Sequence, residues 1–496
     1  MITMPVERTI RATDERVAII GAGPGGLTAA YELQKISPKY IPVVLEAGGL
    51  VGGIARTESH NGFRFDIGGH RFFTKVPEVE AMWNEVLGDD FIKVPRLSRI
   101  YYRGRFFYYP LKVFNALWNI GPYESIRIVL SYVKWQVRPN PREENFEDWV
   151  INRFGGRLYM HFFRSYTKKV WGIEPNLIQA DFAAQRIRNL SLGKAIWNAI
   201  SGANNTASLI DEFRYPRLGP GMLWERVAEL VRAAGGEVRM RSRVERILRE
   251  GARVLAVEVC VDNGLGGRRT ELVEADHFIN SMALRDLIEQ FDPPPPKDVR
   301  AAAAQLRYRD FLVVTLILDH PDPFPDNWIY IHSGEVSVGR IQNFRAWSSD
   351  MVPDPTKSSI GMEYFCAEGD VLWEMSDEEL TAKAAGELEF LGLARADSVV
   401  DSAVIRQPKA YPVYDSQYKG AVAIIAEWLK TLENFQTIGR NGLHRYNNQD
   451  HSMLTAMLAA RNIAGGQHDV WTVNVERAYQ EEFQLPRKEL ARTTIA

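Results

Sequence analysis

The sequence of 496 residues predicts an α/β fold, in which a domain with a parallel sheet is interrupted by a helical insertion and by a second, β-rich domain. Three observations lead to this prediction. A strand, a helix and a second strand succeed one another near the N-terminus. The chain then becomes rich in aromatic residues at helical spacing. After FDPPPP at residues 291–296, strand-like runs dominate.

The first strand is the short, apolar and β-branched run RVAII at residues 16–20, which is typical of a buried strand. The glycine-rich turn GAGPGG and the amphipathic stretch LTAAYELQKI come after it. A second apolar run, IPVVLEA, covers residues 41–47. This order predicts a βαβ unit of the Rossmann-like kind, with its two strands parallel.

The turn after the first strand carries a dinucleotide-binding pattern. Gly21, Gly23 and Gly26 form GxGxxG, in which the glycines allow a tight turn, close approach to a pyrophosphate and close helix–strand packing. The N-terminus of the next helix offers free N–H groups to phosphates. Glu46 ends the next strand, where an acid holds ribose hydroxyls. These features together predict a bound dinucleotide.

The rest of the chain divides into parts with different sequence patterns. Residues 77–214 are dominated by helical and aromatic patterns, as in NFEDWVINRFGGRLYMHFFRSYTKKVWG, and FDPPPP marks the start of the strand-rich part. We therefore predict a discontinuous dinucleotide-binding domain at 1–76, 215–292 and 411–496, a helical domain at 77–214, and a β-rich substrate domain at 293–410.

Composition excludes several classes of protein. The formal charge is −2, so nothing in the balance favours nucleic acid as a partner. Cys260 and Cys366 form no CxxC pair, and no metal-ligating spacing of histidines occurs, so no metal site is expected. No apolar run has the length of a membrane span, and the first residues lack the apolar core of a signal peptide. A cytoplasmic location is expected.

The segment AGGLVGGIARTES at residues 47–59 indicates which dinucleotide is bound. Gly52, Gly53, Arg56 and Thr57 after Glu46 resemble the second glycine pattern of FAD-binding flavoproteins. In those proteins this segment runs along the pyrophosphate and the ribityl chain. RSRVERIL, with Val244, resembles the later strand whose backbone meets the adenine. The resemblance therefore implies FAD.

A further stretch, FDIGGHRFFTK at residues 65–75, places two glycines before a histidine. Glycines allow backbone to approach a flat group because they have no side chain. In the resembling flavoproteins that group is the isoalloxazine ring. Gly68, Gly69 and His70 are accordingly expected beside it, with His70 donating a hydrogen bond or stabilising charge on reduced flavin. The alternative is a histidine that only orders a loop.

Four later segments are similar to those of UDP-galactopyranose mutases, within the broader group that includes amine and protoporphyrinogen oxidases. They are SYTKKVWGIEPNLIQADFAAQRI (165–187), VGRIQNFRAW (338–347), YPVYD (411–415) and GRNGLHRYNNQDHSM (439–453). The first and second would supply Arg186 and Arg340 as a clamp on a substrate diphosphate. The planar fork of arginine pairs with phosphate oxygens at two points.

The resemblance implies a set of site residues in three groups. The catalytic residues are His70, Arg186, Arg340, Tyr411 and Tyr446. The substrate-binding residues are Trp171 and Asn448. The cofactor-binding residues are Gly21, Gly23, Gly26, Glu46, Gly53, Arg56, Thr57, Gly69, Val244, Gly439, Arg440, Asp450, His451 and Ser452.

The implied activity is redox-neutral interconversion of the pyranose and furanose forms of a nucleotide sugar, through attack of reduced flavin N5 on the anomeric carbon. Such an enzyme needs NAD(P)H or another reductant to prepare its flavin. Two alternatives stay open. One is an FAD-dependent oxidase or desaturase like the amine or protoporphyrinogen oxidases, and the other is a flavin-binding sensor or scaffold. The sequence identifies neither the sugar nor the oligomeric state.

Overall fold

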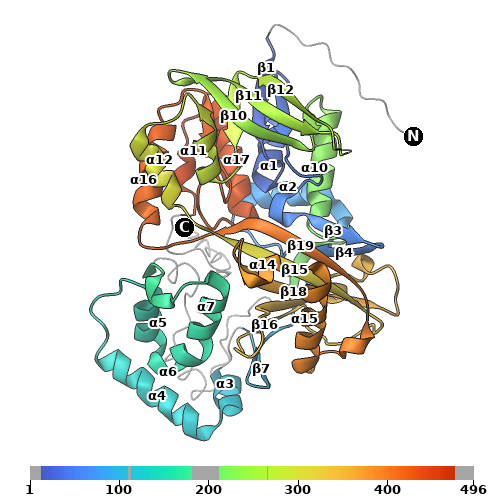
Figure 1. Ribbon diagram of the computed structural model, residues 1–496, viewed down its shortest axis with the longest axis vertical. Helices are drawn as coiled ribbons and strands as arrows, with labels where there is room; N and C mark the ends of the chain where they lie inside the picture. Colours follow the sequence, from blue (N-terminus) through green and yellow to red (C-terminus); the bar gives the residue numbers. More distant parts are fainter. Residues whose placement is uncertain (1–12, 110–112, 181–211, 265, 475–496) are drawn as a thin grey trace, which may run out of the picture.

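The computed structural model describes residues 13–109, 113–180, 212–264 and 266–474 (Figure 1). Within these residues the chain is built around a five-stranded sheet in the upper half of the view and a seven-stranded sheet in the lower half. Helices pack on the upper sheet, and a separate group of helices lies beside the lower one. The predicted α/β class, with a helical insertion and a second β-rich part, is confirmed.

The upper sheet is parallel throughout and contains the predicted βαβ unit. Its strands, in spatial order, are β20 (Phe435–Thr437), β13 (His277–Asn280), β1 (Glu15–Ile20), β2 (Tyr40–Leu45) and β9 (Glu237–Arg239). The last four residues of β1 and all six of β2 are buried. Continuous apolar runs form these strands because both faces of a parallel sheet are covered.

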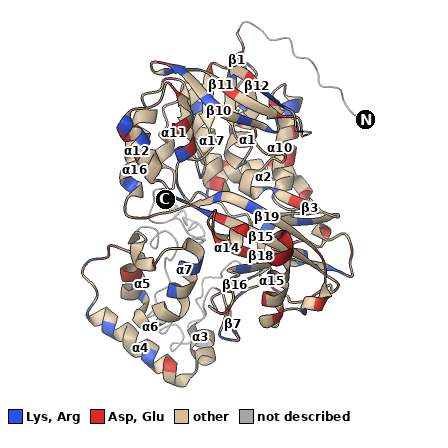
Figure 2. Ribbon diagram, in the orientation of Figure 1, with Lys and Arg blue, Asp and Glu red and all other residues tan. Residues whose placement is uncertain are grey.

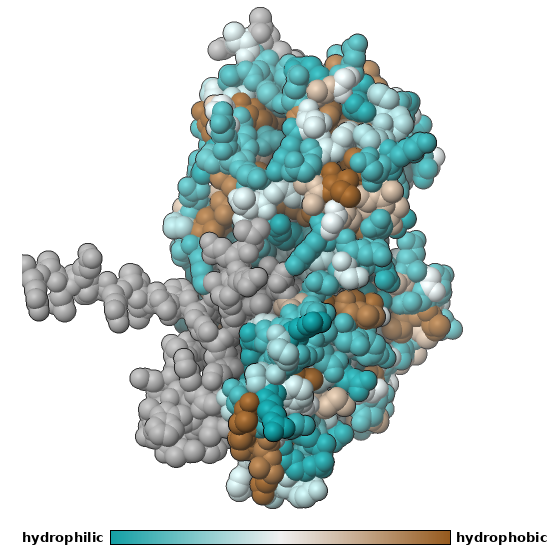
Figure 3. All heavy atoms as spheres, turned by 90° about the vertical axis from the view of Figure 1, so that its left-hand side faces the viewer, coloured by the Kyte–Doolittle hydropathy of each residue, from teal (hydrophilic) through white to brown (hydrophobic). Residues whose placement is uncertain are grey.

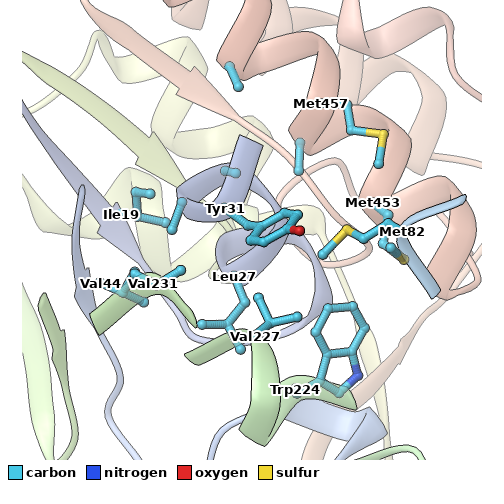
Figure 4. Packing of buried hydrophobic residues seen from close by; sticks show 14 of the residues in the cluster. Ile19, Leu27, Tyr31, Val44, Met82, Trp224, Val227, Val231, Met453 and Met457 are labelled. Atoms are coloured by element: carbon cyan, nitrogen blue, oxygen red, sulfur yellow. The ribbon is translucent and has the colours of Figure 1, made fainter. Parts of the chain in front are cut away.

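One face of this sheet packs against helices from distant parts of the chain. They are α1 (Pro24–Ile36), α2 (Pro77–Leu87), α10 (Gly221–Ala233) and α17 (Gln449–Ile463). Figure 4 shows Tyr31 of α1 beside Met453 of α17, and Leu27 of α1 beside Val227 of α10. This core joins the three sequence ranges predicted for the dinucleotide-binding domain, and it also includes α2 from the range predicted to be the helical domain.

The other face packs against a smaller sheet and three helices. The elements are β10 (Ser242–Glu250), β11 (Arg253–Asp262), β12 (Arg268–Glu274), β14 (Phe291–Asp292), α11 (Leu284–Gln290), α12 (Lys297–Gln305) and α16 (Tyr418–Leu429). Helix α12 lies beyond FDPPPP, yet its buried Val299 and Ala303 share a core with Ile425 of α16. Residues 297–305 therefore pack with the dinucleotide-binding part, and the β-rich part starts at Tyr308 rather than at residue 293.

The lower sheet contains both predicted and unexpected strands. In spatial order they are β19 (Val399–Pro412), β15 (Tyr308–Leu318), β18 (Ser358–Cys366), β17 (Arg340–Asn343), β16 (Trp328–Ile331), β6 (Ser98–Tyr102) and β7 (Arg105–Tyr108). Helix α15 (Asp377–Phe390) packs on this sheet through Leu380, Ala384 and Leu388. Its N-terminus is closed by a capping box between Ser376 and Glu379.

Among its described residues, the range predicted to be helical, 77–214, contains α2, a further group of helices and four strands. The helices of that group are α3 (Val113–Ile120), α4 (Pro122–Val137), α5 (Phe146–Phe154), α6 (Gly156–Leu158), the π-helical turn η3 (Tyr159–Phe163) and α7 (Arg164–Trp171). Besides β6 and β7, the strands are β5 (Phe91–Pro95) and β8 (Glu212–Pro216), which pair with each other. All four strands are short, and β6 and β7 carry aromatic residues on both faces, so these two do not alternate clearly in sequence.

The hairpin of β6 and β7 did carry a local signal. Its turn is Arg103-Gly104, and both residues have positive φ, 51° and 73°. An X-Gly pair between two aromatic runs is typical of a tight hairpin turn. Pairing of β6 with β16 attaches this part of the chain to the β-rich domain.

The remaining elements are short. They are β3 (Thr57–His60), β4 (Phe63–Asp66), α13 (Phe344–Trp347), α14 (Val371–Glu374), and the 3₁₀ turns η1 (Gly53–Ala55), η2 (Gly88–Asp90), η4 (Pro175–Leu177), η5 (Ser349–Met351), η6 (Ala396–Ser398) and η7 (Val470–Thr472). None of the helices that the structure describes is both long and apolar enough to cross a bilayer. Within the same residues, no group of His, Cys, Asp or Glu side chains is arranged to hold a metal ion.

Candidate cofactor and substrate site

The turn between β1 and α1 has the geometry that its glycines predict. Gly21 has a φ of 99°, in the region that favours glycine. A Cβ on Gly26 would lie 1.9 Å from the Gly21 carbonyl oxygen, so strand and helix approach too closely for a side chain. Helix α1 begins at Pro24 with Gly23 as N-cap, and no side chain caps it. Its first N–H groups are therefore available to an anionic ligand.

Glu46 lies directly beside this turn. Its carboxylate accepts hydrogen bonds from the backbone N–H groups of Ala22 (2.8 Å) and Gly48 (2.7 Å). A carboxylate has about four acceptor positions. Glu46 thus fixes the turn and still has capacity to accept hydroxyl groups from a ribose.

Three glycine segments converge at the N-terminus of α1. Gly52 N–H donates to the Ala22 carbonyl oxygen at 2.8 Å. A Cβ built on Gly23 would lie 3.8 Å from Gly53 Cα, and one on Gly25 would lie 3.7 Å from Gly439 Cα. Backbone from three distant segments therefore surrounds an uncapped helix end with few side chains between them. This cradle fits the pyrophosphate of a dinucleotide such as FAD.

Arg56 and Thr57 hold this cradle in place. The guanidinium of Arg56 donates to the Gly53 carbonyl oxygen at 2.9 Å and to Gln407 Oε1 at 2.7 Å, and pairs with Glu58. Thr57 Oγ1 donates to Asp66 Oδ1 at 2.9 Å and accepts the Gly221 N–H at 3.0 Å. Both predicted residues lie at the cofactor cradle, and their side chains connect it to β4, β19 and α10.

Asp66 is a buried carboxyl group that the sequence did not single out. It receives hydrogen bonds from Thr57 and from the Tyr215 hydroxyl. Burial raises the pKa of Asp66 to about 7, although both hydrogen bonds lower it. The folded protein therefore holds a proton on Asp66 at pH values where the unfolded chain has lost it.

This linkage gives a pH-dependent stability. A carboxyl whose pKa is raised on folding destabilises the protein increasingly as pH rises from the unfolded to the folded pKa. With a rise from 3.8 to about 7, the loss for Asp66 is on the order of 4 kcal/mol. The asparagine of Asp66→Asn carries no charge, so this variant should escape the loss. We expect the free energy of unfolding of Asp66→Asn minus that of wild type, both measured with urea, to rise by about the same amount from pH 4 to pH 8. Parallel pH profiles for the two proteins would contradict it.

Gly68, Gly69 and His70 lie against the β-rich domain. A Cβ on Gly69 would lie 2.9 Å from Gln342 Nε2, and one on Gly68, whose φ is 93°, would lie 3.3 Å from Arg340 Nη2. The glycines therefore allow close approach to side chains of β17. Stacking of a flavin ring on this backbone remains a prediction.

His70 is held neutral. Burial first, then the positive charge of Arg440 and to a lesser extent that of Arg340, lower its pKa to about 4, while backbone hydrogen bonds oppose this shift. In the tautomer with a proton on Nε2, the ring donates to the Ile67 carbonyl oxygen at 3.0 Å. At neutral pH this histidine is thus a neutral hydrogen-bonding group beside two guanidinium groups.

Arg340 is anchored by a carboxylate from the neighbouring strand. Its Nε donates to Glu363 Oε2 at 2.6 Å, and Gln342 Nε2 donates to the other oxygen at 2.8 Å. Glu363 is fully buried. Burial alone would lower the pKa of Arg340, but the charge of Glu363 and the nearby tyrosine hydroxyls raise it well above its usual value. Arg340 therefore presents a permanent positive charge.

Three predicted aromatic residues meet in one cluster. Tyr411 and Tyr446 stack with ring centroids 5.5 Å apart and an interplanar angle of 15°. Trp171 contacts both rings, with centroid distances of 6.2 and 6.0 Å. The Arg440 guanidinium lies 4.8 Å from the Tyr446 centroid and 5.5 Å from that of Tyr411. The structure thus brings together residues that are far apart in sequence.

The C-terminal segment packs under this cluster. Arg440 Nε donates to the Asn447 carbonyl oxygen at 2.8 Å, and the Gly439 N–H donates to Thr455 Oγ1 at 3.0 Å. Asn448 is the exposed N-cap residue of α17. Asp450, His451 and Ser452 are buried in the first turn of that helix. These residues position the N-terminus of α17 near Gly439, which itself lies beside the dinucleotide cradle.

For two predicted site residues, Val244 and Arg186, the described part of the structure gives no side-chain contact with the site. Val244 lies in β10, and its side chain is buried in the core between the upper sheets. The same strand begins with the Ser242 N–H donating to the Glu46 carbonyl oxygen at 2.7 Å, so it does pass the cradle. Arg186 lies outside the described residues.

Besides Arg340 and Arg440, a third arginine lies near tyrosines, and sequence reasoning did not single it out. The Arg96 guanidinium lies 5.9 Å from the Tyr109 centroid and 5.5 Å from that of Trp328. Its three nitrogens are shielded from solvent and donate to no acceptor in the described chain. Tyr109 packs on Tyr330 at 4.7 Å, and Tyr330 is the cross-strand neighbour of Arg340. Arg96 is therefore connected to the neighbourhood of Arg340 through Tyr109 and Tyr330. The only sequence signal was a basic residue before the aromatic run of β6 and β7.

The comparison with protein families defines the class. The sequence profile described as "Flavin containing amine oxidoreductase" matches residues 24–419. Together with the dinucleotide cradle, this match makes the protein an FAD-dependent flavoenzyme. The chain belongs to the flavin-containing amine oxidoreductase family.

Proteins with solved structures of the same fold include a mutase and an oxidase. Reduced UDP-galactopyranose mutase is similar over 93% of this chain and 98% of its own, with a TM-score of 0.80 and 21% identity. Putrescine oxidase with putrescine bound is similar over 91% and 99%, with a TM-score of 0.60 and 16% identity. At these identities the likeness establishes the fold.

Among curated proteins, coproporphyrinogen III oxidase of Mycobacterium leprae is 35% identical over 75 residues. That stretch is 15% of this chain and 17% of the relative, so the match spans a small part of either protein. The family and the fold are therefore defined, and the reaction is inferred from the site.

Proposed function

We propose that the protein is a nucleotide-sugar mutase that interconverts pyranose and furanose forms of an NDP-hexose without net oxidation. The observation that carries this proposal is the position of Arg340. Its guanidinium is anchored on the buried Glu363, next to the neutral His70 and among the tyrosines that include Tyr411. A fixed cation beside a wall of tyrosine rings suits a substrate with a phosphate group and a sugar.

The charge of the site supports an anionic substrate. Arg340 has one acidic partner, Glu363, whereas Arg440 donates to backbone carbonyl oxygens and Arg96 donates to none. In the described part of the site, positive charge thus exceeds negative charge. A diphosphate would be stabilised there, and a cationic amine would be repelled. On this basis amine oxidation is disfavoured for this chain.

The aromatic cluster supports a sugar substrate. Tyr411 and Tyr446 form one rigid face, to which Trp171 adds an edge. A tyrosine offers a hydroxyl group on a flat apolar body, which suits the face of a hexose. These rings also exclude water from the site, which strengthens the interaction of Arg340 with a phosphate.

When bound, reduced FAD would supply the nucleophile, and the flavin would be reduced again at the end of the rearrangement. Arg340 would hold the displaced nucleoside diphosphate and offset its charge. Keeping the diphosphate in place makes its return effectively intramolecular. His70, neutral at working pH, would keep its one N–H on the Ile67 carbonyl oxygen and present Nδ1 as an uncharged acceptor. Reduction of the flavin would need NAD(P)H or another donor.

The proposal is tested by incubating the purified holoprotein with UDP-, dTDP- and GDP-hexopyranoses, with its flavin oxidised or chemically reduced. The expected product is an isomer of equal mass, resolved by chromatography, which forms only with reduced flavin. A product that has lost two hydrogens, with matching flavin reduction, would overturn the proposal in favour of an oxidoreductase.

A binding measurement separates substrate recognition from turnover. UDP should raise the melting temperature, because a ligand at 100 times its Kd stabilises the folded state by about 2.7 kcal/mol. The Arg340→Lys variant should lose most of this protection. Arg345→Lys serves as the matched control, since Arg345 donates to the Lys357 carbonyl oxygen away from the site. Equal protection of both variants would remove Arg340 from the proposed diphosphate site.

A further inference from the structure

Helix α4 exposes an apolar stripe along its whole length. Tyr123, Ile126, Leu130, Val133 and Val137 succeed one another at intervals of three and four residues, so they share one face of the helix. Each is at least half exposed, from 50% at Val133 to 73% at Tyr123. Trp118 of the preceding α3 is 85% exposed. Soluble proteins rarely expose large apolar residues contiguously, so this stripe indicates an interaction surface.

The opposite side of α4 accounts for its attachment to the rest of the protein. Ile128 is fully buried in the core of the helical group, and Gln136 donates to the Asn152 carbonyl oxygen at 2.8 Å. The helix is therefore anchored by one face and presents another outward. Figure 1 places α4 at the lower edge of the molecule, and Figure 3 shows a strip of apolar surface at that lower end.

The exposed charges of α4 are positive. Arg127, Lys134 and Arg138 each come one position after an apolar stripe residue, and all three are exposed. The one acid of the helix, Glu124, is turned inward, where it pairs with Arg157 and contacts His161 Nε2, and its other oxygen lies 3.5 Å from Arg127. Basic residues on α4 are visible in Figure 2. The helix thus combines an apolar stripe with a basic flank along one side.

We infer that α4, together with Trp118, docks the protein on the surface of an anionic lipid bilayer. A helix with this pattern lies in the interface plane, with its apolar face in the acyl boundary and its basic residues at the head groups. Trp118 and Tyr123 are residue types that accumulate at that depth. This surface is independent of the proposed reaction, because none of its residues lines the candidate site.

A second copy of the chain is a poorer occupant of the same surface. Apolar stripes spaced by three and four residues also form helix pairs. Packing two α4 helices together would place Arg127, Lys134 and Arg138 of both copies at one seam, where Glu124 offsets only Arg127. Phosphate head groups provide that compensation, at about 1 kcal/mol for each basic residue near the surface.

The test is co-sedimentation of the holoprotein with vesicles of phosphatidylcholine alone or mixed with phosphatidylglycerol. We expect binding to the mixed vesicles, weaker binding to pure phosphatidylcholine, and release from the mixed vesicles by salt. Ile126→Ser with Leu130→Ser should lower the partition coefficient by roughly 100-fold, from the lost apolar burial. Arg127→Gln with Lys134→Gln and Arg138→Gln should lower it by a similar factor.

The matched control removes exposed apolar residues elsewhere. Val371 and Phe390 are 76% and 62% exposed and lie on the β-rich domain, so Val371→Ser with Phe390→Ser should leave vesicle binding unchanged. Retained flavin absorbance and melting temperature identify variants that stay folded. The inference is overturned if the wild-type protein ignores anionic vesicles. It is also overturned if light scattering shows a dimer that the α4 serine variant dissociates.

Discussion

Replacing Arg340 by alanine is expected to lower the free energy of unfolding by about 3–5 kcal/mol at pH 8, because the substitution leaves Glu363 buried without its cation. Gln342 would remain as the main hydrogen-bond donor to that carboxylate. Urea unfolding monitored by tryptophan fluorescence measures the loss.

The pH dependence of this loss identifies its cause. Burial already raises the pKa of Glu363, and removing Arg340 takes away the charge that lowers it. A carboxyl with a raised folded pKa is least destabilising at low pH, where it is protonated in both states. The deficit of Arg340→Ala relative to wild type should therefore shrink as pH falls towards 4. A deficit that stays constant from pH 4 to pH 8 would exclude the buried charge as its source.

A double variant provides the control. Arg340→Met with Glu363→Gln removes both charges and keeps a partner for Gln342, so it should recover most of the stability. The same double variant should still lack protection by UDP, because the cation is absent. Stability and ligand binding are thereby separated at one position.

Replacing Gly26 by alanine is expected to release the flavin. The new Cβ would lie 1.9 Å from the Gly21 carbonyl oxygen, a backbone atom that moves only if the whole turn opens. Overpacking of this kind costs about 1–3 kcal/mol, and a similar loss of binding free energy raises the Kd for FAD by about 5- to 150-fold. Flavin absorbance of the purified protein, and titration of the apoprotein with FAD, measure the effect.

Gly386 offers a matched control for this substitution. It lies within α15, and a Cβ there would meet no atom within 4 Å. Alanine stabilises an exposed helix interior by about 0.5–1 kcal/mol relative to glycine. Gly386→Ala should therefore keep its flavin and melt slightly higher than wild type. Full flavin content in Gly26→Ala would show that the turn tolerates a side chain and is not the cradle we describe.

The turn between β1 and α1 could be predicted in detail because its requirements are local. Gly21 has a positive φ, Gly26 leaves no room for a Cβ beside the Gly21 carbonyl oxygen, and Glu46 lies at the end of the next strand. A short window of sequence contains that information, whereas the approach of Gly53 and Gly439 to this turn depends on long-range packing. The two parallel strands were predictable for the same reason, since their apolar runs are continuous.

The substrate side could be predicted only through resemblance. Nothing near Trp171 in the sequence indicates that it meets Tyr411 and Tyr446, because these contacts depend on how whole domains pack. Glu363 did carry a signal. It is a charged residue within the buried strand SSIGMEYFC, and a charge there requires a partner. The sequence could not say that the partner is Arg340.

The division into domains was predicted less well because it relied on changes in composition and residue pattern along the chain. FDPPPP does mark a break, but Val299 and Ala303 of the next helix pack back on the dinucleotide-binding part. Strands β6 and β7 were grouped with the helices because aromatic residues occupy both of their faces. In both cases long-range packing decided what composition left open.

Pairing of β6 with β16 has a consequence for recombining this protein with its relatives. A chimaera cut at residues 77 and 214 would take β6 and β7 away with the helices, and would leave the backbone of β16 as an open edge. Open edges promote aggregation. Joints placed after β7 and before β8 would transplant the helices, including the α4 surface, without disturbing either sheet. Because Trp171 of α7 moves with these helices, such a chimaera would inherit the α4 surface and one wall of the proposed substrate site from the same parent.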